Sequence, residues 1–389
     1  MTINKDISVY KKLGVTPIIN GRGCITIHGG KVMSETVVAS MIEASKSSVL
    51  LNELIDKATA RLAELTGAEA AFISSGATSG LFISGLACLA GSDPESIQDL
   101  PEVKSGKNEF VISTVDEHSY VHQAFRGSGG LLVPVGTDES VNTQDYEDGI
   151  NDKTAAIVFF YGSQTKNELT EIIEIAEKYS VPVVIDCAAQ IPPKSNLTDL
   201  VAMGADLVVY SGGKGIGGPQ CTGLILGKKD LINACKLNSN PNSALGRSMK
   251  VGKEEIIGLL TAVEELMSND EEALIKKWIS WCDVIVAGAH GFSGVIAKTI
   301  PPYFHMAGGA HAPASPTVEI DFRNSKLNAD DIRIMLENNN PPIMVSTEKW
   351  ETDLTEAKDD VIVLGPGALQ KGEAEVIAEA LKKILTDIS

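Results

Sequence analysis

The 389-residue sequence predicts an α/β protein with a large domain built on a mostly parallel sheet, followed by a smaller α+β domain. From residue 50 onward, short apolar runs rich in β-branched residues alternate with helical segments. This alternation of strand-like and helical segments changes near residue 250. Continuous apolar runs are typical of strands that helices cover on both faces. We therefore expect an N-terminal segment that packs with the small domain, a large domain and a small C-terminal domain, over residues 1–50, 51–250 and 251–389.

The large domain begins with an amphipathic helix from Asn52 to Leu65, which ends at Gly67. A strand from Ala70 to Ile73 and a buried helix over residues 81–91 follow. A further helix is predicted from Glu168 to Tyr179. Six other apolar runs have the length and composition of strands, at residues 110–113, 131–135, 155–161, 181–186, 206–212 and 222–227.

The final third of the sequence mixes short strands with helices. Glu254 to Met267 predicts a long helix, the run TVEIDF (317–322) predicts a strand, and Glu373 to Leu385 predicts a last amphipathic helix. The less regular order of these elements is typical of an α+β domain.

Composition argues against several classes of protein. A net charge of −18 repels phosphate groups, so neither nucleic acid nor an anionic membrane is an expected partner. The apolar stretches are too short or too interrupted for a transmembrane helix, and the first residues lack the apolar region of a secretory signal. The six cysteines include no C-x-x-C pair, which predicts reduced thiols and a cytoplasmic location.

The most informative region contains Asp186 and Lys214. Asp186 ends the apolar run VVID, at the position where open α/β sheets bind ligands. Lys214 follows another strand in a glycine-rich loop, SGGKGIGGPQ (211–220), whose backbone can approach a ligand closely. A partly desolvated lysine can lose its proton and become a nucleophile. Pyridoxal 5′-phosphate (PLP) needs such an amine for a Schiff base, and an acid that faces its pyridine nitrogen.

The other interpretations of the glycine-rich loop are weaker. Gly213, Gly215 and Gly218 spell the dinucleotide fingerprint G-x-G-x-x-G, but that fingerprint opens a helix, whereas a Pro-Gln pair and another apolar strand follow here. The Walker phosphate-binding pattern is absent because Gly215 comes directly after Lys214. A flexible surface loop with a solvated lysine is the remaining alternative.

Two further segments bear on a cofactor. The turn SSGATS (74–79) lies between a strand and a helix, and small residues at a helix N-terminus suit a phosphate, although any helix N-cap has this composition. His118 and His122 share a face if their segment is helical, but a third metal ligand is missing, so no metal site is predicted. We expect His118 to stack on a cofactor ring and His122 to be an ordinary, partly buried histidine.

In combination, these segments resemble the PLP-dependent fold-type-I (aspartate aminotransferase-like) superfamily, and within it the selenocysteine synthase-related group. The resemblance covers nearly the whole chain. It is greater to the D-glucosaminate-6-phosphate ammonia-lyase-like members than to the selenium transferase, because the acidic charge disfavours tRNA and no extra tRNA-contacting domain is expected. The matching segments include INGRGCITIHGG (19–30), ELTGAEAAFISSGATSGL (64–81), VPVVIDCAAQIPP (181–193), SGGKGIGGPQCTGLILGKKDLI (211–232) and LGRSMKVGKEEIIGLLTAVE (245–264).

The resemblance implies a seven-stranded type of sheet and a role for each candidate residue. Lys214 would carry the Schiff base, Asp186 would pair with the pyridine nitrogen, and His118 would stack on the ring. The phosphate would be held by Gly76, Ala77, Thr78 and Ser211. Anionic substrate groups would bind Arg247 and Lys250, and Arg22 joins them because a guanidinium suits carboxylate and phosphate. A homodimer or larger homo-oligomer is also implied, whereas Cys24 and Cys187 depart from the residues expected at their positions.

The predicted reaction is α,β-elimination on a hydroxylated amino acid or amino sugar acid, possibly phosphorylated, to give a 2-keto acid and ammonia. Lys214 would remove the Cα proton, and Lys214 or His118 would protonate the leaving hydroxyl. Racemisation, aldol cleavage and β-replacement begin from the same carbanion and stay open as alternatives, as does a non-catalytic binding protein with the PLP fold.

Overall fold

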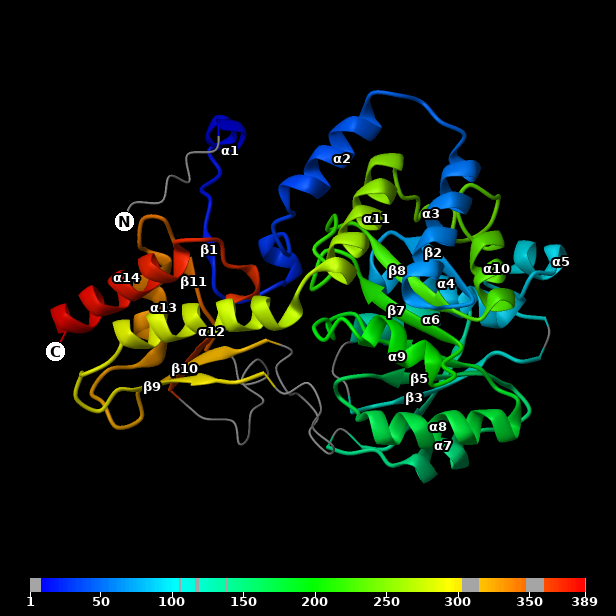
Figure 1. The fold of residues 1–389 in the computed structure, drawn as a ribbon. Coiled ribbons are helices and arrows are strands. Elements are labelled where there is room, and N and C mark those ends of the chain that lie inside the picture. The colour runs from blue at the N-terminus through cyan, green and yellow to red at the C-terminus, as the bar shows by residue number, and fades with distance from the viewer. Residues whose placement is uncertain are drawn as a thin grey trace. The chain divides into compact units, whose positions relative to one another are not determined.

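The computed structural model describes residues 8–104, 106–115, 119–137, 139–302, 315–347 and 360–388. The chain forms two compact units (Figure 1), a larger one from residues 33–269 and a smaller one from the described residues on either side. These boundaries differ from the expected 50 and 250. The reason is that α2 (Glu35–Ser45) and α11 (Lys253–Ser268) pack against each other, and α11 buries Ile256, Leu259 and Val263 in the core of the larger unit.

A seven-stranded sheet forms the centre of the larger unit, in the order β2-β8-β7-β6-β5-β3-β4. Six strands run in one direction, and β8 is antiparallel to both of its neighbours. The predicted α/β class and mostly parallel sheet are thus confirmed, and the carboxyl ends of the six parallel strands share one edge. The strands are β2 (Ala70–Ser74), β3 (Glu109–Ser113), β4 (Leu131–Val135), β5 (Thr154–Phe160), β6 (Val183–Asp186), β7 (Leu207–Ser211) and β8 (Gly223–Gly227).

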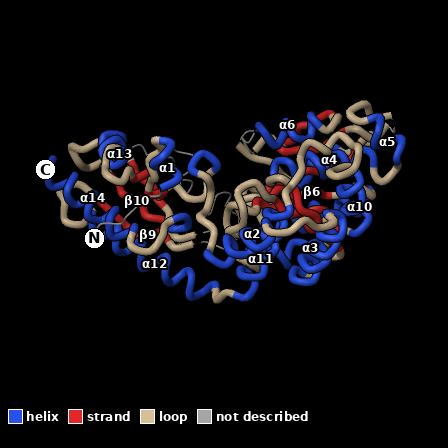
Figure 2. Tube along the Cα trace, turned by 90° about the horizontal axis from the view of Figure 1, so that it is seen from above, coloured by secondary structure: helices blue, strands red, loops and turns tan. Residues whose placement is uncertain are grey.

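Helices cover both faces of this sheet. Figure 2 shows α4 and α6 on one side and α2, α3 and α11 on the other. We call these sides the α4 face and the α11 face, after one helix on each. Each face has its own separate cluster of buried side chains. The α4 face has α4 (Ala77–Ala90), α6 (Ser119–Gly127) and α10 (Lys229–Leu237); the α11 face also has α3 (Leu51–Thr66), α7 (Thr143–Gly149), α8 (Lys166–Tyr179) and α9 (Asn196–Ala202).

The smaller unit contains a three-stranded antiparallel sheet in the order β12-β10-β9. β1 (Ile19–Asn20) pairs in parallel with β11 (Ile343–Met344), which ties the N-terminal segment to this unit. None of the helices in the described part of the chain has the length and apolar character that a membrane crossing requires. The remaining elements are α1 (Ser8–Leu13), α12 (Glu271–Gly288), β9 (Ile296–Ile300), β10 (Thr317–Asp321), α13 (Ala329–Glu337), β12 (Val361–Leu364) and α14 (Glu373–Ile388), and in the larger unit α5 (Pro94–Asp99).

Candidate active site

Several predicted site residues lie at the carboxyl edge of the seven-stranded sheet. Asp186 is the last residue of β6, and Ser211 is the last residue of the neighbouring strand β7. On the other side of β7, Ser211 is in register with Gly223 of β8, which is in turn in register with Ser74 of β2. Segments more than 100 residues apart in the sequence are therefore brought together within four adjacent strands.

The side chains of Asp186 and Ser211 point to the α4 face. Val184 belongs to the cluster on that face, and Asp186, two residues later in β6, faces the same way because side chains alternate along a strand. Val209 gives the same orientation for Ser211. Since α4 begins on this face at Ala77, its N-terminus, the carboxylate and the hydroxyl share one face of the sheet.

Lys214 lies in the turn that follows β7. It is half-buried, and within the described part of the chain its ammonium has no hydrogen-bond or ion-pair partner. The turn packs closely on its neighbours, because a Cβ atom at Gly215 would overlap the carbonyl oxygen of Ile191. A lysine amine is the group that forms a Schiff base with an aldehyde.

The N-terminus of α4 forms an anion cradle. Its N-cap, Gly76, has φ +106°, a conformation that other residues rarely adopt. The hydroxyl of Ser74 donates to the carbonyl oxygen of Gly76 (2.9 Å), and Ser79 Oγ donates to Ser75 O (3.2 Å), so the turn is fixed from both sides. The first N–H groups of α4 have no partner within the helix, and together with the helix dipole they favour a bound anion.

The residues at this edge fit PLP. A Cβ atom at Gly223 would lie 2.5 Å from Ser74 Oγ and 2.6 Å from Gly76 O, so only glycine lets β8 pass beside the cradle. The cradle suits a phosphate, the amine of Lys214 suits an aldehyde, and the carboxylate of Asp186 suits a protonated pyridine nitrogen. Asp186 Oδ1 also accepts a hydrogen bond from the Ala188 N–H (3.0 Å), which favours the charged carboxylate.

Of the two candidate histidines, only His122 belongs to the described residues. His118 lies outside the described residues. His122 is half-buried in α6, where its Nε2 lies 3.2 Å from Ser113 O and its ring meets the Phe160 ring edge-on at 6.0 Å. These are the contacts of an ordinary histidine. The described residues contain no group of three or more His, Cys, Asp or Glu side chains placed to hold a metal ion.

The predicted substrate-binding cations do not lie on the Lys214 loop. Arg247 is exposed, and its guanidinium donates to the carbonyl oxygen of Pro241 in its own turn. Lys250 is exposed three residues later. Arg22 belongs to the smaller unit, where its backbone N–H donates to Asn20 Oδ1 (3.1 Å). Their roles in substrate binding stay predictions.

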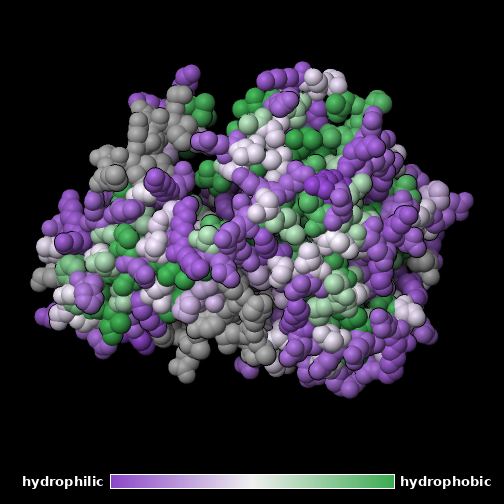
Figure 3. Space-filling view, in the orientation of Figure 1, coloured by the Kyte–Doolittle hydropathy of each residue, from purple (hydrophilic) through white to green (hydrophobic). Residues whose placement is uncertain are grey.

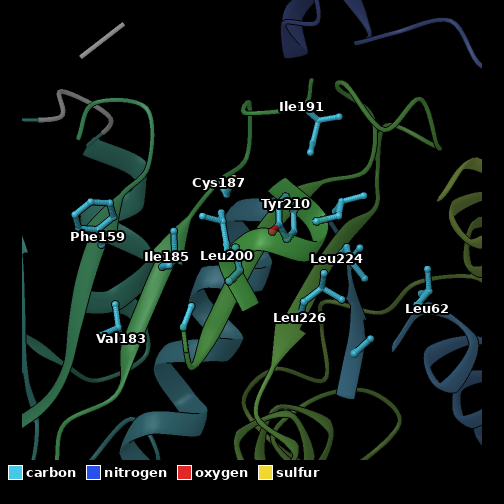
Figure 4. Close-up of a cluster of buried hydrophobic side chains, with 14 of the residues drawn as sticks. Leu62, Phe159, Val183, Ile185, Cys187, Ile191, Leu200, Tyr210, Leu224 and Leu226 are labelled. Carbon is cyan, nitrogen blue, oxygen red and sulfur yellow. The ribbon is translucent and has the colours of Figure 1, made fainter. Parts of the chain in front are cut away.

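Cys187 follows Asp186 but is fully buried on the α11 face, in the same cluster as Ile191 and Tyr210 (Figure 4). Burial, and to a lesser degree the charge of Asp186, raises the pKa of the Cys187 thiol well above its usual range. The thiol therefore stays protonated at neutral pH. Burial also raises the pKa of Tyr161, the residue after β5, to about 12, and the backbone N–H of Tyr161 donates to Asp186 O (3.0 Å).

Sequence reasoning missed Tyr161 as a neighbour of Asp186, and it also missed a buried polar residue at the start of α9, Asn196. Neither belongs to a motif. The only signal for Tyr161 was its position at the end of an apolar run that pairs with the run ending at Asp186.

Comparison with known proteins identifies the family. The model of the L-seryl-tRNA selenium transferase family matches residues 53–280. A 5′-C-glycyluridine monooxygenase-decarboxylase from a Streptomyces species is 33% identical over 299 residues, which cover 75% of this chain and 73% of that protein. The D-glucosaminate-6-phosphate ammonia lyase of Salmonella typhimurium is 27% identical over 384 residues, which cover 97% of this chain and 98% of that protein.

Solved structures agree with the sequence matches. A D-glucosaminate-6-phosphate ammonia-lyase structure has a TM-score of 0.80 and 26% identity, and the match covers 98% of this chain and 99% of that one. The cysteine desulfurase CsdA of Escherichia coli shares the fold, with a TM-score of 0.57 and 15% identity over 96% of this chain and 95% of that one. The predicted superfamily and cofactor are thereby confirmed. The chain belongs to the L-seryl-tRNA selenium transferase family, and it is a fold-type-I enzyme that depends on pyridoxal 5′-phosphate.

Proposed function

We propose that the protein is a carbon–nitrogen lyase that converts a hydroxylated, sugar-derived amino acid into a 2-keto acid and ammonia. The observation that carries this proposal is the match over nearly the full length of both chains to a D-glucosaminate-6-phosphate ammonia lyase. D-Glucosaminate 6-phosphate is therefore the first substrate to test. Loss of the β-hydroxyl as water is balanced by the water that hydrolyses the resulting imine.

We assign the cofactor to the carboxyl edge of the sheet. Lys214 would bind its aldehyde carbon, Asp186 would face its pyridine nitrogen, and His118 would stack on its ring. The phosphate would be held by Gly76, Ala77, Thr78 and Ser211. When bound, the cofactor withdraws electrons from Cα of the substrate and so makes the Cα proton acidic.

The chain's own residues would move the protons. Lys214 Nζ, half-buried and without a carboxylate partner among the described residues, is the base for the Cα proton. Asp186 would keep a proton on the pyridine nitrogen through its opposite charge. Lys214 or His118 would then protonate the leaving hydroxyl. The carboxylate and phosphate of the substrate would bind three cations that we assign by their chemistry alone, namely Arg22, Arg247 and Lys250.

We also propose that the protein is a homodimer. Apolar side chains are exposed on α2 and on the connection to α3. They include Ile42 (55% exposed) and Leu50 (75% exposed), together with Val38 and Val49. Figure 3 shows hydrophobic surface gathered over this part of the larger unit. On a chain with a net charge of −18, an apolar patch of this kind is typical of a protein interface.

The first test of the proposal is the visible absorption spectrum of the purified protein. We expect a band that borohydride bleaches, together with a reduced cofactor adduct on Lys214 in the peptide mass spectrum, and neither in Lys214→Ala. Incubation with D-glucosaminate 6-phosphate should then release ammonia and a 2-keto acid in equal amounts. A colourless protein that stays colourless with added PLP would contradict the assignment of the cofactor site.

A second candidate reaction is oxidative decarboxylation, which is favoured by the 33% identity to the 5′-C-glycyluridine monooxygenase-decarboxylase. A monooxygenase consumes O₂ and a decarboxylase releases CO₂, whereas elimination needs no oxygen. Turnover under nitrogen, with ammonia and keto acid as products, supports the lyase. Oxygen-dependent release of CO₂ from a glycyl nucleoside supports the alternative. Racemisation, aldol cleavage and β-replacement need separate assays, for an altered enantiomer, an aldehyde and an exchanged side chain respectively.

A further inference from the structure

Asn196 connects strand β7 to the segment that borders the Lys214 loop. It is the first residue of α9 and only 5% exposed. Its carbonyl oxygen accepts a hydrogen bond from the hydroxyl of Tyr210 in β7 (2.7 Å), and its Nδ2 donates to the carbonyl oxygen of Gln190 (2.6 Å). One buried residue on the α11 face therefore holds two separate segments of the chain.

The segment that Asn196 holds is also the one that the Lys214 loop touches. Gln190 is followed by Ile191, and the carbonyl oxygen of Ile191 occupies the position that a Cβ atom at Gly215 would need. A closed ring of contacts results, from Tyr210 through Asn196 and Gln190–Ile191 to Gly215, and back along the chain to β7. Figure 4 shows Tyr210 on β7 and Ile191 on the segment that follows β6. Buried, close-packed contacts of this kind leave the loop few alternative positions.

The segment that contains Gln190 and Ile191 begins directly after Asp186, at the other end of the proposed cofactor site. Within this segment, the N–H of Ala188 donates to Asp186 Oδ1 (3.0 Å). We propose that Asn196 is a positioning residue, which fixes the Lys214 amine relative to the Asp186 carboxylate. This inference rests on the proposed attachment of the cofactor to Lys214, but not on the ammonia-lyase reaction.

The experiment compares Asn196→Ala with Asn238→Ala. Asn238 is also a fully buried asparagine, and its Nδ2 donates to the carbonyl oxygens of Gly91 and Ala234, both at 2.9 Å, on the α4 face. Asn196→Ala removes the side-chain donor from the Gln190 carbonyl, and Asn238→Ala removes it from the Gly91 carbonyl, whereas the Ala234 carbonyl keeps the backbone N–H of residue 238. Both variants should therefore lower the melting temperature. They differ in that only Asn196 contacts the segment beside Lys214.

The readouts follow Lys214 itself rather than turnover. In Asn196→Ala, we expect the pH midpoint of the absorption change of the lysine-bound cofactor to shift by about one unit. We also expect PLP added to the apoprotein to modify Lys214 about tenfold more slowly, as measured by trapping with borohydride. In Asn238→Ala, both values should match the wild type. Tyr210→Phe removes only the hydroxyl that binds Asn196, and it should shift the midpoint in the same direction by a smaller amount.

An unchanged midpoint and trapping rate in Asn196→Ala would overturn the inference, as would an equal shift in Asn238→Ala. If Asn196→Ala does not fold, Tyr210→Phe decides by the same two readouts. A wild type that carries the cofactor on Lys214 but releases no ammonia counts against the lyase proposal alone. A wild type in which Lys214 is never modified overturns the inference together with the proposed attachment.

Discussion

Asp186 and Cys187 are neighbours in the sequence, but their side chains point to opposite faces of the sheet. Asp186 is half-buried on the α4 face, where the N-terminus of α4 forms the anion cradle. Cys187 is fully buried on the other face, and its raised pKa keeps the thiol neutral. At this strand end one residue supplies charge for the proposed cofactor site, and the next supplies packing.

Replacement of Asp186 by Asn tests the charged member of this pair. The amide retains the shape and can still accept the Ala188 N–H, but it removes the negative charge. An opposite charge shifts the pKa of a neighbouring group, here the pyridine nitrogen that Asp186 is proposed to face, by about 1–3 units. We therefore expect turnover to fall by about 10²-fold while the melting temperature changes little. Steady-state kinetics and a thermal melt check this. Wild-type turnover in Asp186→Asn would remove the residue from the mechanism.

Replacement of Cys187 by Ala tests whether this residue contributes only to packing. We expect the free energy of unfolding to fall by about 1 kcal/mol, because a small buried side chain loses its contacts. The visible spectrum and turnover should stay unchanged. Urea denaturation gives the first value and absorbance the second. A variant of normal stability that loses its absorption band would instead show that the thiol takes part in the chemistry.

Among the elements, the strands of the large sheet were predictable and their arrangement was not. Burial on both faces requires a continuous apolar run, so β2 to β8 were each identified within two residues of their observed ends. An apolar run does not encode direction, however, and the reversal of β8 appears only in the structure. The apolar face of α11 likewise did not show which core would bury it, and the structure places it in the core of the larger unit.

The site was predictable to a similar extent. Lys214, Asp186 and the 74–79 turn stand out because unusual residue types interrupt apolar runs. Asn196 does not stand out, because a polar residue at a helix start is common and its role depends on Gln190 and Tyr210, 6 and 14 residues away.

The two ends of β8 offer a matched pair of substitutions. A Cβ atom at Gly223 would press on Ser74 Oγ and Gly76 O beside the cradle, whereas one at Gly227 would overlap the backbone of Asp206 at the opposite end of the strand. Both Gly→Ala variants should lose about 1–3 kcal/mol of unfolding free energy. Only Gly223→Ala should also weaken PLP binding, by about tenfold. Titration of the apoproteins with PLP checks this, and equal weakening in both would argue against a phosphate site at this turn.

The exposed face of α2 can be tested with Ile42→Glu. A carboxylate at this exposed position should leave the fold intact, but it would place a charge in a desolvated interface of the proposed homodimer. We expect the dimer to dissociate at concentrations at which the wild type stays associated. Sedimentation velocity measures this directly, with Glu43→Gln on the same helix as a control. A wild type that sediments as a monomer would contradict the proposal.

For the molecule as a whole, the net charge bears on the reaction after which its family is named. Its net charge of −18 opposes any polyanion, and we expect it to bind seryl-tRNA more weakly than about 10⁻⁴ M at physiological salt. Fluorescence anisotropy with labelled tRNA checks this. Saturable binding in the micromolar range would contradict the prediction and would favour the β-replacement alternative.

The residues proposed to anchor the cofactor, apart from His118, come from a single compact unit, between Gly76 of the cradle and Lys214. This arrangement has a use in protein engineering. A combinatorial library restricted to the turn around Arg22, which lies outside that unit, leaves the proposed anchoring set untouched, so its members should keep the visible absorption band of the cofactor. Colour would then report intact loading in every clone, and screening for a new substrate would start from variants that already hold the reactive group.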